Sequence, residues 1–280
     1  MKREENNKRP SGSEYNSNEQ ESLGFQSEFR KKGAGNIRDL CEIKKVDSTT
    51  THLPKNRFMK MGVILSHPFS ACLIGGTGSG KTNLLVNMLT RKEFYKGYFK
   101  DIFIFTPSPS DGMLEHLISE GVVDEDHIIS EDMIEELNSL IKSQEEECKK
   151  SFKRSRRTLV IFEDVSSNHK LMNSKSFKKC FVQNRHLNMS CFALFHKYKI
   201  LPRMCRLNSH GIFFFKSSNS ENEAISEDHC PPGMTKQKFL DMIEYATTQL
   251  SHETNSKPFL FINTQQGLQK RYNKTLGQAL

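Results

Sequence analysis

The chain has 280 residues, a formal net charge of +8 and seven cysteines, a length that suits one α/β domain with polar tails. No apolar run approaches the ~20 residues that span a bilayer, and the polar N-terminus lacks the apolar stretch of a signal peptide, so we expect a soluble intracellular protein. The cysteines form no C-x-x-C pair, which argues against a zinc module, and their odd number fits reduced thiols better than a disulfide framework.

Residues 1–50 differ in composition from the rest of the chain. They are rich in Asn, Ser, Glu, Lys and Gly, and their ten basic and nine acidic side chains nearly cancel. A segment with so few apolar residues cannot form a packed core, so we expect a disordered or weakly ordered polar arm. A single folded domain is expected to occupy residues 51–280, and residues 61–65 suggest a short additional strand near its start.

A phosphate-binding motif follows the first central strand of this domain. Residues 69–74 are a short apolar run that ends where glycines begin, and residues 83–89 carry apolar side chains at helical spacing. The eight residues between them match G-x-x-x-x-G-K-[ST], the phosphate loop or Walker A motif. They are Gly75, Gly76, Thr77, Gly78, Ser79, Gly80, Lys81 and Thr82. The motif therefore stands in the strand–loop–helix context that it requires.

The residue types of this loop suit a nucleoside triphosphate with Mg²⁺. Gly75, Gly78 and Gly80 have no Cβ, so the backbone can curl and turn its N–H groups inward. The helix that follows adds free N–H groups and the positive end of its dipole. Lys81 supplies a charge for the β- and γ-phosphates, and the Thr82 hydroxyl is a ligand for Mg²⁺.

Strand-like and helix-like segments alternate along the rest of the chain. β-Rich apolar runs predict strands at residues 101–106, 158–162, 191–195, 212–215 and 259–262, the last of these being the final strand, and residues 128–129 suggest one strand-like turn. Apolar spacings of three and four predict helices at residues 131–150, 175–182 and 236–250, and the helix after the phosphate loop should end near Arg91. The alternation predicts an α/β fold with a mostly parallel central sheet and helices on both faces.

Acidic and basic residues are segregated along the sequence. Residues 111–147 contain thirteen acidic residues and one lysine, which a solvated helix face explains. Residues 166–220 contain ten Lys or Arg and no acidic residue. This stretch includes a core strand, so its charges must emerge in loops and on one helix. The pattern favours nucleic-acid backbone or a neighbouring subunit's nucleotide as partner, although a plain basic face would produce it too.

Two acids in succession, Glu163 and Asp164, end the predicted strand at residues 158–162. A phosphate loop needs a carboxylate at the end of a neighbouring strand to hold Mg²⁺, usually through water. Successive residues at a strand end diverge, so one acid can serve the metal while the other activates the attacking water. A pair of strand-end charges that simply face solvent is the alternative.

Further candidates for the site lie after the next strand. His196 ends the strand at residues 191–195, where it could sense the γ-phosphate or orient water, or be an ordinary strand-end histidine. Arg203 and Arg206 flank a short segment, and either could act as an arginine finger in an adjacent subunit, bind DNA phosphate or cap a helix. Arg185 is a third arginine candidate.

These segments together resemble a known family. His67-Pro68-Phe69 before the first strand, the phosphate loop, the strand with two acids and residues 184–208 are similar to the poxvirus-type genome-packaging ATPases. These enzymes belong to the FtsK–HerA branch of the P-loop ATPases, with relatives in large DNA viruses, virophages, adintoviruses and polinton-like elements. The similarity covers about residues 56–275. Residues 184–208, with their R-H, L-P-R and R-x-N elements, are the part that indicates this branch.

The resemblance implies a RecA-like domain that hydrolyses ATP with Mg²⁺ and forms a homo-oligomeric ring. It implies movement of double-stranded DNA into a preformed viral capsid at its packaging vertex, inside the host cell where virions assemble. Lys81 and Thr82 carry over as phosphate and Mg²⁺ ligands. On this reading Glu163 holds Mg²⁺ indirectly, Asp164 activates water, and Arg206 from the next subunit is the first candidate to complete the site.

Two positions depart from the family pattern. The family usually carries Asp first in the acidic pair, whereas Glu163 precedes Asp164 here, which leaves open which acid is the base. The family usually carries Gln where His196 stands, and a histidine could replace the hydrogen bond of that amide.

Two other classes of function use the same loop. A nucleotide or small-molecule kinase would pair it with an arginine-rich lid, but such kinases need no acid pair like Glu163-Asp164. A nucleotide-gated DNA-binding module is the non-enzymatic alternative, and a GTPase switch would carry an N-K-x-D motif, which the sequence lacks. We favour the DNA-translocating motor.

Overall fold

The structure is a computed structural model that describes residues 56–110, 112–248 and 257–280. The predicted polar arm at residues 1–50, the predicted domain start at residue 51 and Leu250 of the predicted last helix lie outside the described residues. No helix in the described ranges is long and apolar enough to span a membrane.

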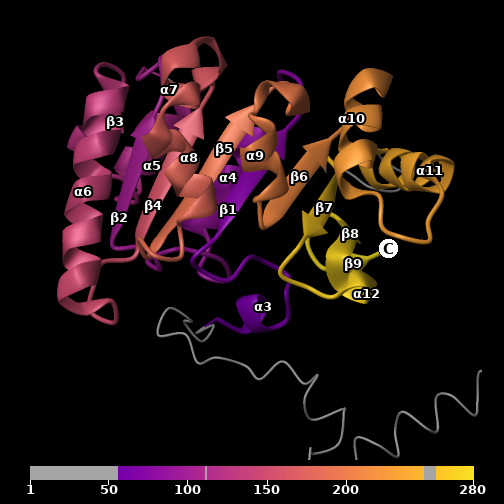
Figure 1. Ribbon diagram of the computed structural model, residues 1–280, viewed down its shortest axis with the longest axis horizontal. Coiled ribbons are helices and arrows are strands. Elements are labelled where there is room, and N and C mark those ends of the chain that lie inside the picture. Colours follow the sequence, from indigo (N-terminus) through magenta and orange to yellow (C-terminus); the bar gives the residue numbers. More distant parts are fainter. Residues whose placement is uncertain (1–55, 111, 249–256) are drawn as a thin grey trace, which may run out of the picture. The chain divides into compact units, whose positions relative to one another are not determined.

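A single sheet with the strand order β3-β2-β4-β5-β1-β6-β7-β8-β9 organises the described residues. The strands from β3 to β6 are all parallel, whereas β7, β8 and β9 pair antiparallel with their neighbours. Figure 1 shows this sheet with β1 at its centre. The strands are β1 Ser70–Ile74, β2 Asp101–Phe105, β3 Ile128–Ile129, β4 Thr158–Glu163, β5 Met189–Phe195, β6 Gly211–Phe215, β7 Phe259–Asn263, β8 Tyr272–Lys274 and β9 Gln278–Ala279.

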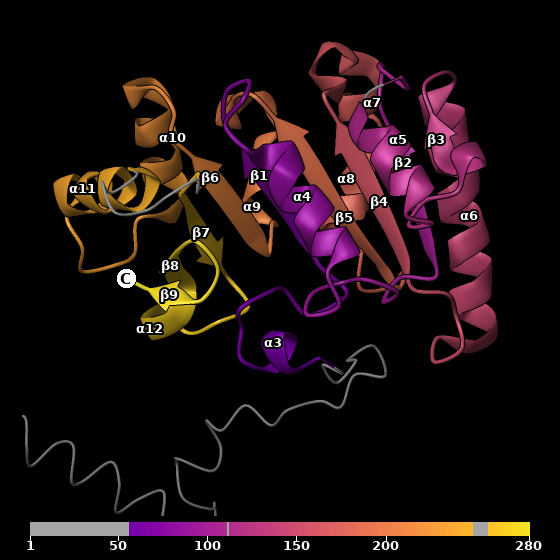
Figure 2. The same ribbon diagram turned by 180° about the vertical axis from the view of Figure 1, so that it is seen from behind.

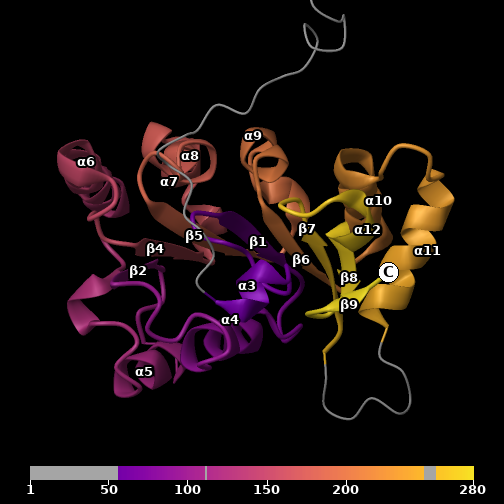
Figure 3. The same ribbon diagram turned by 90° about the horizontal axis from the view of Figure 1, so that it is seen from below.

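Helices cover both faces of the sheet. α6, α8 and α9 lie on the face turned to the viewer in Figure 1, and α4 and α5 lie on the face seen in Figure 2. Figure 3 shows the two layers with the sheet between them. The α-helices are α3 Arg57–Lys60, α4 Lys81–Thr90, α5 Gly112–Ser119, α6 Met133–Ser151, α7 His169–Asn173, α8 Lys175–Val182, α9 Arg203–Leu207, α10 Asn219–His229, α11 Lys236–Thr247 and α12 Leu268–Arg271; the 3-10 turns are η1 Glu125–His127, η2 Val165–Ser167 and η3 Tyr198–Ile200.

Alternation along the central strand divides the core into two apolar layers. Ala71 and Leu73 of β1 pack in the layer that includes Leu85 of α4, whereas Cys72 and Ile74 belong to the layer on the opposite face. Every residue of β1 is buried, as expected for a parallel strand covered on both sides. This two-sided burial fixes the carboxyl end of β1, from which the phosphate loop starts.

The predicted α/β class with a mostly parallel sheet and helices on both faces is confirmed. The strands predicted from the phosphate loop onward form, and the helix after the phosphate loop ends at Thr90 with Arg91 as its C-cap. The prediction for residues 236–250 is confirmed as far as Thr247, where α11 ends. These elements carry strong apolar periodicity or length, so local pattern was sufficient to predict them.

Two predictions about the ends of the domain were wrong. Residues 61–65 form no strand, because Gly62 has a φ of +75° and the chain turns back so that Val63 N–H donates to Phe58 O at 2.9 Å. The strand at residues 259–262 is not the last, because β8 and β9 follow it as short polar strands. α5 and α10 were not predicted at all, and the apolar face of α10 is reduced to Ala224 and Ile225.

Candidate functional site

The phosphate loop begins where β1 leaves the core. Gly78 and Gly80 have φ values of +70° and +104°, a region that side chains with a Cβ rarely adopt. Gly75 is needed for a different reason, since a Cβ there would lie 2.7 Å from Phe215 Cβ and 2.7 Å from Ser79 Oγ. The loop therefore combines two positions that require left-handed backbone with one that requires space.

Lys81 lies inside the curve of the loop. Its Nζ donates to Gly75 O at 2.6 Å and to Gly76 O at 3.0 Å, and the residue is only 9% exposed. Burial lowers the pKa of Lys81, and the nearby carboxylates of Asp164 and Glu163 oppose that shift. No side chain caps the N-terminus of α4, so its first N–H groups are available to an anion.

The carboxyl ends of β1, β4 and β5 meet beside this loop. β5 pairs in parallel with both β1 and β4, and Glu163 lies in register with Leu194. A cavity of about 300 Å³ opens at this edge of the sheet. It is lined by Thr77, Gly78, Lys81, Thr82, Thr106, Ser108, Glu163, Asp164, Leu194 and His196. The structure thus brings together the predicted phosphate ligand, the predicted Mg²⁺ ligands, both acids and the histidine.

Glu163 and Asp164 have different surroundings although they are adjacent. Glu163 ends β4 and is 8% exposed, whereas the side chain of Asp164 is 55% exposed. Asp164 has a φ of +47°, so the chain turns sharply there and directs the two carboxylates differently. Its Oδ1 lies 3.4 Å from His196 Nε2. The pair therefore offers one buried carboxylate and one accessible carboxylate that a histidine contacts.

Two polar lining residues of this cavity, Thr106 and Ser108, were missed as site candidates. Thr106 follows β2, and its Oγ1 accepts a hydrogen bond from Ser108 N–H at 3.2 Å. The signal was available, because polar residues after a parallel strand collect at the same edge as the other strand ends. We interpreted Thr106 only as the end of a strand.

The loop also borders a second cavity. This cavity of about 480 Å³ is lined by residues 76–79 of the loop together with Phe215, Lys216, Thr247, Thr248, Lys257 and Pro258. Lys257 donates through its Nζ to Gly78 O. No sequence motif marks Lys257, because it lies far from the loop along the chain and meets it only through the sheet.

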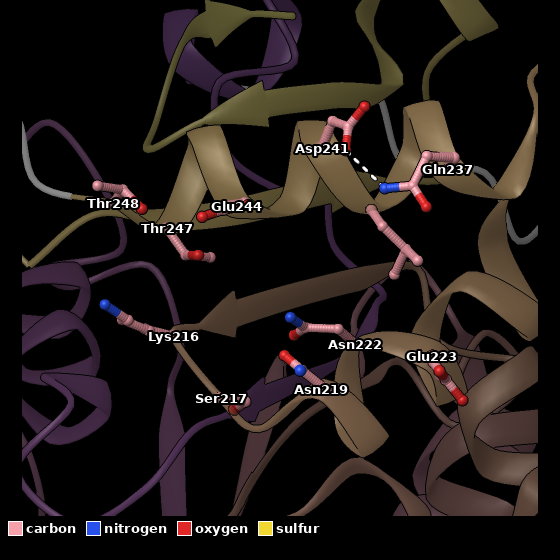
Figure 4. A pocket seen from close by; sticks show the side chains of 11 residues that line it. Lys216, Ser217, Asn219, Asn222, Glu223, Gln237, Asp241, Glu244, Thr247 and Thr248 are labelled. Carbon is pink, nitrogen blue, oxygen red and sulfur yellow. Dashed lines mark hydrogen bonds between the residues drawn. The ribbon is translucent and has the colours of Figure 1, made fainter.

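A third cavity of about 490 Å³ lies between α10 and α11 (Figure 4). It shares Lys216, Thr247 and Thr248 with the second cavity, so the two adjoin. Polar side chains dominate its walls, and Gln237 donates to Asp241 Oδ1 at 2.8 Å. The loop thus borders the acid-lined cavity and the second cavity, and the second cavity adjoins the third.

The three candidate arginines lie away from the acid-lined cavity and do not line it. Arg206 Nη1 pairs with Asp228 Oδ2 at 3.0 Å, its guanidinium lies 4.7 Å from the centre of the Tyr198 ring, and its side chain is 12% exposed. Arg203 is 72% exposed, with Nε 3.6 Å from Asp228 Oδ1. Arg185 is exposed and lies 3.2 Å from His210 Nε2. Within its own chain, Arg206 therefore joins α9 to α10.

The model of the family described as "Poxvirus A32 protein" matches residues 55–263, about three quarters of the chain. The chain belongs to the poxvirus A32 protein family. This A32-family chain is 30% identical to "DNA packaging protein OPG160" of Vaccinia virus (strain Copenhagen) over 191 residues, which cover 65% of this chain and 67% of that protein. It is 31% identical to the protein of the same name from Monkeypox virus, with 65% and 60% covered.

Among solved structures, the A32-family chain is similar to the genome packaging NTPase B204 from Sulfolobus turreted icosahedral virus 2, determined in complex with ATP-gammaS. The identity is 14% and the TM-score is 0.49. The match covers 76% of this chain and 98% of that one.

Proposed function

We propose that this protein is an ATP-hydrolysing motor that moves double-stranded DNA into a preformed viral capsid. The observation that carries the proposal is the shared cavity, in which the phosphate-loop residues Lys81 and Thr82 face Glu163, Asp164 and His196. Membership of the A32 family supports the choice of motor over kinase, because the vaccinia and monkeypox relatives are named DNA packaging proteins.

In this proposal, the phosphates of ATP would bind in the loop, with the γ-phosphate toward the acid-lined cavity. Lys81 and the uncapped N-terminus of α4 would stabilise the phosphate charge. The nucleoside would then occupy the second cavity, which is lined by Phe215, Lys216 and Pro258. Lys257, which contacts the loop at Gly78, is suited to hold the loop in place there.

Thr82 and Glu163 suit Mg²⁺, because they line one cavity and offer the hard oxygen ligands that this ion prefers. Bound there, Mg²⁺ would neutralise the charge that develops on the β- and γ-phosphates. Asp164 is suited to accept the proton of the attacking water, since its carboxylate is the more exposed of the two acids. His196 would orient that carboxylate through the 3.4 Å contact.

An arginine from a neighbouring subunit would complete the site in a homo-oligomeric ring. Arg206 was the first candidate from sequence, but its guanidinium is engaged with Asp228 in its own chain. Arg185 has an exposed side chain and is better placed to reach another subunit. The ring, the capsid contact and action at the site of virion assembly all belong to the proposal.

The test is ATP hydrolysis by the purified full chain, with and without double-stranded DNA, together with mass in solution. We expect a multimer whose turnover rises when DNA is added. Turnover that is indifferent to DNA, with phosphate passed to a small acceptor, would contradict the motor and support a kinase.

Two matched amide substitutions test the division of labour between the acids. Asp164→Asn should lower kcat by about 10²–10⁴-fold, because it removes the proposed base. Glu163→Gln should raise the Mg²⁺ concentration needed for half-maximal turnover, because it removes a charge beside the metal. If Glu163→Gln instead lowers kcat and Asp164→Asn instead raises the Mg²⁺ requirement, Glu163 is the base and Asp164 is the residue beside the metal.

A further inference from the structure

The segment of residues 197–207, here called the η3–α9 segment, follows β5 directly. Its side chains divide into an inner and an outer set. Tyr198, Leu201 and Cys205 are fully buried and form the inner set. The outer set comprises six exposed side chains, those of Lys197, Lys199, Ile200, Arg203, Met204 and Leu207. The segment therefore presents one mixed cationic and apolar surface to its surroundings.

The inner set is fixed to α10 by polar contacts. Tyr198 N–H donates to Glu221 Oε2 at 2.6 Å, and the Tyr198 hydroxyl lies 3.1 Å from Asp228 Oδ2 and 2.7 Å from His229 Nε2. Arg206 adds its pair with Asp228 on the same helix. With so many directional contacts beneath it, the outer surface is held in one orientation.

The two lysines of the outer surface have no internal partner in the described part of the chain, and the Arg203 guanidinium makes only a long contact of 3.6 Å with Asp228 Oδ1. Lys197 and Lys199 have no ion-pair or hydrogen-bond partner for their side chains among the described residues, and Arg203 is 72% exposed. No acidic residue occurs from residue 166 to residue 220. α8 lies beside α9 in Figure 3 and carries the exposed Lys175. Cations without internal partners are suited to phosphate groups.

The η3–α9 segment is also joined to the acid-lined cavity. His196 lines that cavity and contacts Asp164, and Lys197 is the next residue in the chain. A change at the γ-phosphate position that displaces His196 would therefore displace the start of the segment.

We propose that the η3–α9 segment is the surface that contacts the phosphate backbone of double-stranded DNA. This inference rests on the proposed motor function and assigns the DNA contact to particular residues. Lys197, Lys199 and Arg203 contact phosphates without reading sequence, which is what a translocating motor requires. The link through His196 couples this contact to the state of the nucleotide.

The exposed Ile200, Met204 and Leu207 raise a competing use of the same surface. Apolar side chains of this size are exposed by 37–47% and would suit contact with a second copy of the chain. Lys197 and Lys199 favour DNA over a second copy of the chain. The described residues provide no carboxylate that pairs with them, whereas each nucleotide of DNA carries a phosphate. An experiment on the lysines therefore separates the two partners.

The test compares the full chain carrying Lys197→Gln and Lys199→Gln with a control carrying Lys92→Gln and Lys100→Gln. The control lysines are exposed and lie outside the acid-free stretch, so both variants lose the same charge. Binding to a 30-base-pair duplex of mixed sequence is measured over a range of salt concentrations, with basal and DNA-stimulated ATP turnover and mass in solution.

We expect the slope of log affinity against log salt to fall by about 2 in the test variant, since each lost phosphate contact removes about 0.9. DNA stimulation should fall while basal turnover and mass stay as in the control. Equal slopes in the two variants would overturn the proposal, as would a loss of the multimer confined to the test variant, which would assign the surface to a second copy. Absence of DNA stimulation in the unsubstituted chain would instead contradict the proposed function itself.

Discussion

Two regions of this protein combine the same residue types with opposite results. Around the phosphate loop, Lys81 faces two acids and a histidine across a cavity of about 300 Å³. Between α9 and α10, Arg206 also faces a carboxylate and a histidine, but here Asp228 is 5% exposed and the ion pair closes at 3.0 Å. The first region is an open cluster and the second is a closed one.

The two clusters differ in how deeply and how tightly their charged groups are paired within the chain. In the closed cluster the Tyr198 ring lies against Arg206, so that region is satisfied within the chain. In the open cluster Asp164 is largely exposed and its contact with His196 is long, at 3.4 Å. Charged groups kept beside a cavity can act on a ligand, whereas the same groups paired and packed can only stabilise the fold.

The largest effect should come from removing the cation of the open cluster. Lys81→Ala should lower ATP turnover on the order of 10³-fold, because the loop loses the charge that stabilises the transferring phosphate. The melting temperature should change little, since Lys81 bonds only to carbonyls of its own loop. Lys92→Ala, an exposed lysine beyond α4, is the matched control. Turnover within tenfold of the unsubstituted chain would contradict the assignment.

The closed cluster should respond in stability. Arg206→Ala should lower the free energy of unfolding by about 3 kcal/mol, because the buried Asp228 carboxylate loses its closest cation and keeps, among the described residues, only the Tyr198 hydroxyl and the exposed Arg203. Arg203 lies on the same helix and contacts the same aspartate, but its side chain is exposed. Arg203→Ala should therefore lower the free energy of unfolding by less than about 1 kcal/mol. Urea unfolding measures both. Equal losses in the two variants would remove the distinction between a closed and an open cluster.

Acid should also weaken the closed cluster. Burial lowers the pKa of His229 to about 4, with Arg206 adding to the shift and Asp228 opposing it. The unfolded chain takes up this proton near pH 6.5 and the folded chain does not, so the stabilisation is complete above pH 6.5 and is lost as pH falls toward 4. The loss amounts to about 3 kcal/mol. His229→Gln should flatten the unfolding profile over this interval, and an unchanged profile would show that His229 is not held neutral.

The smallest effect should come from replacing His196 of the open cluster with the glutamine that the family usually carries there. His196→Gln should change turnover by less than about tenfold, because an amide can keep the contact with Asp164 that the imidazole makes. His196→Ala cannot, and should lower turnover further while leaving the affinity for ATP unchanged. Equal turnover in the two variants would indicate that His196 is an ordinary strand-end residue.

The open cluster could be predicted from the sequence because each of its parts is a short, contiguous sequence pattern. The phosphate loop is one continuous motif between a strand and a helix, and Glu163 and Asp164 directly follow an apolar strand. That these acids and His196 would meet the loop followed from a single rule, since the carboxyl ends of parallel strands share an edge of the sheet. The cavity lining is consistent with that prediction.

The closed cluster was not predictable in the same way. Asp228 lies on α10, a helix with only a weak apolar face, and nothing in its spacing indicates Arg206 as its partner. The contact of Lys257 with Gly78 spans most of the chain, and β8 and β9 are too short and too polar to be recognised. Contacts of this kind depend on how helices and antiparallel strands pack, which local pattern does not encode.

The amino-acid sequence by itself determined the fold class and the phosphate site, because periodicity and a contiguous motif specify local structure. Only the tertiary structure decided which charged groups stay accessible to a ligand. It paired Arg206 with Asp228, left Lys197 and Lys199 on an exposed surface, and kept Asp164 beside a cavity. A charge becomes a functional group or a structural one according to the partners that packing brings to it, and those partners come from distant parts of the chain.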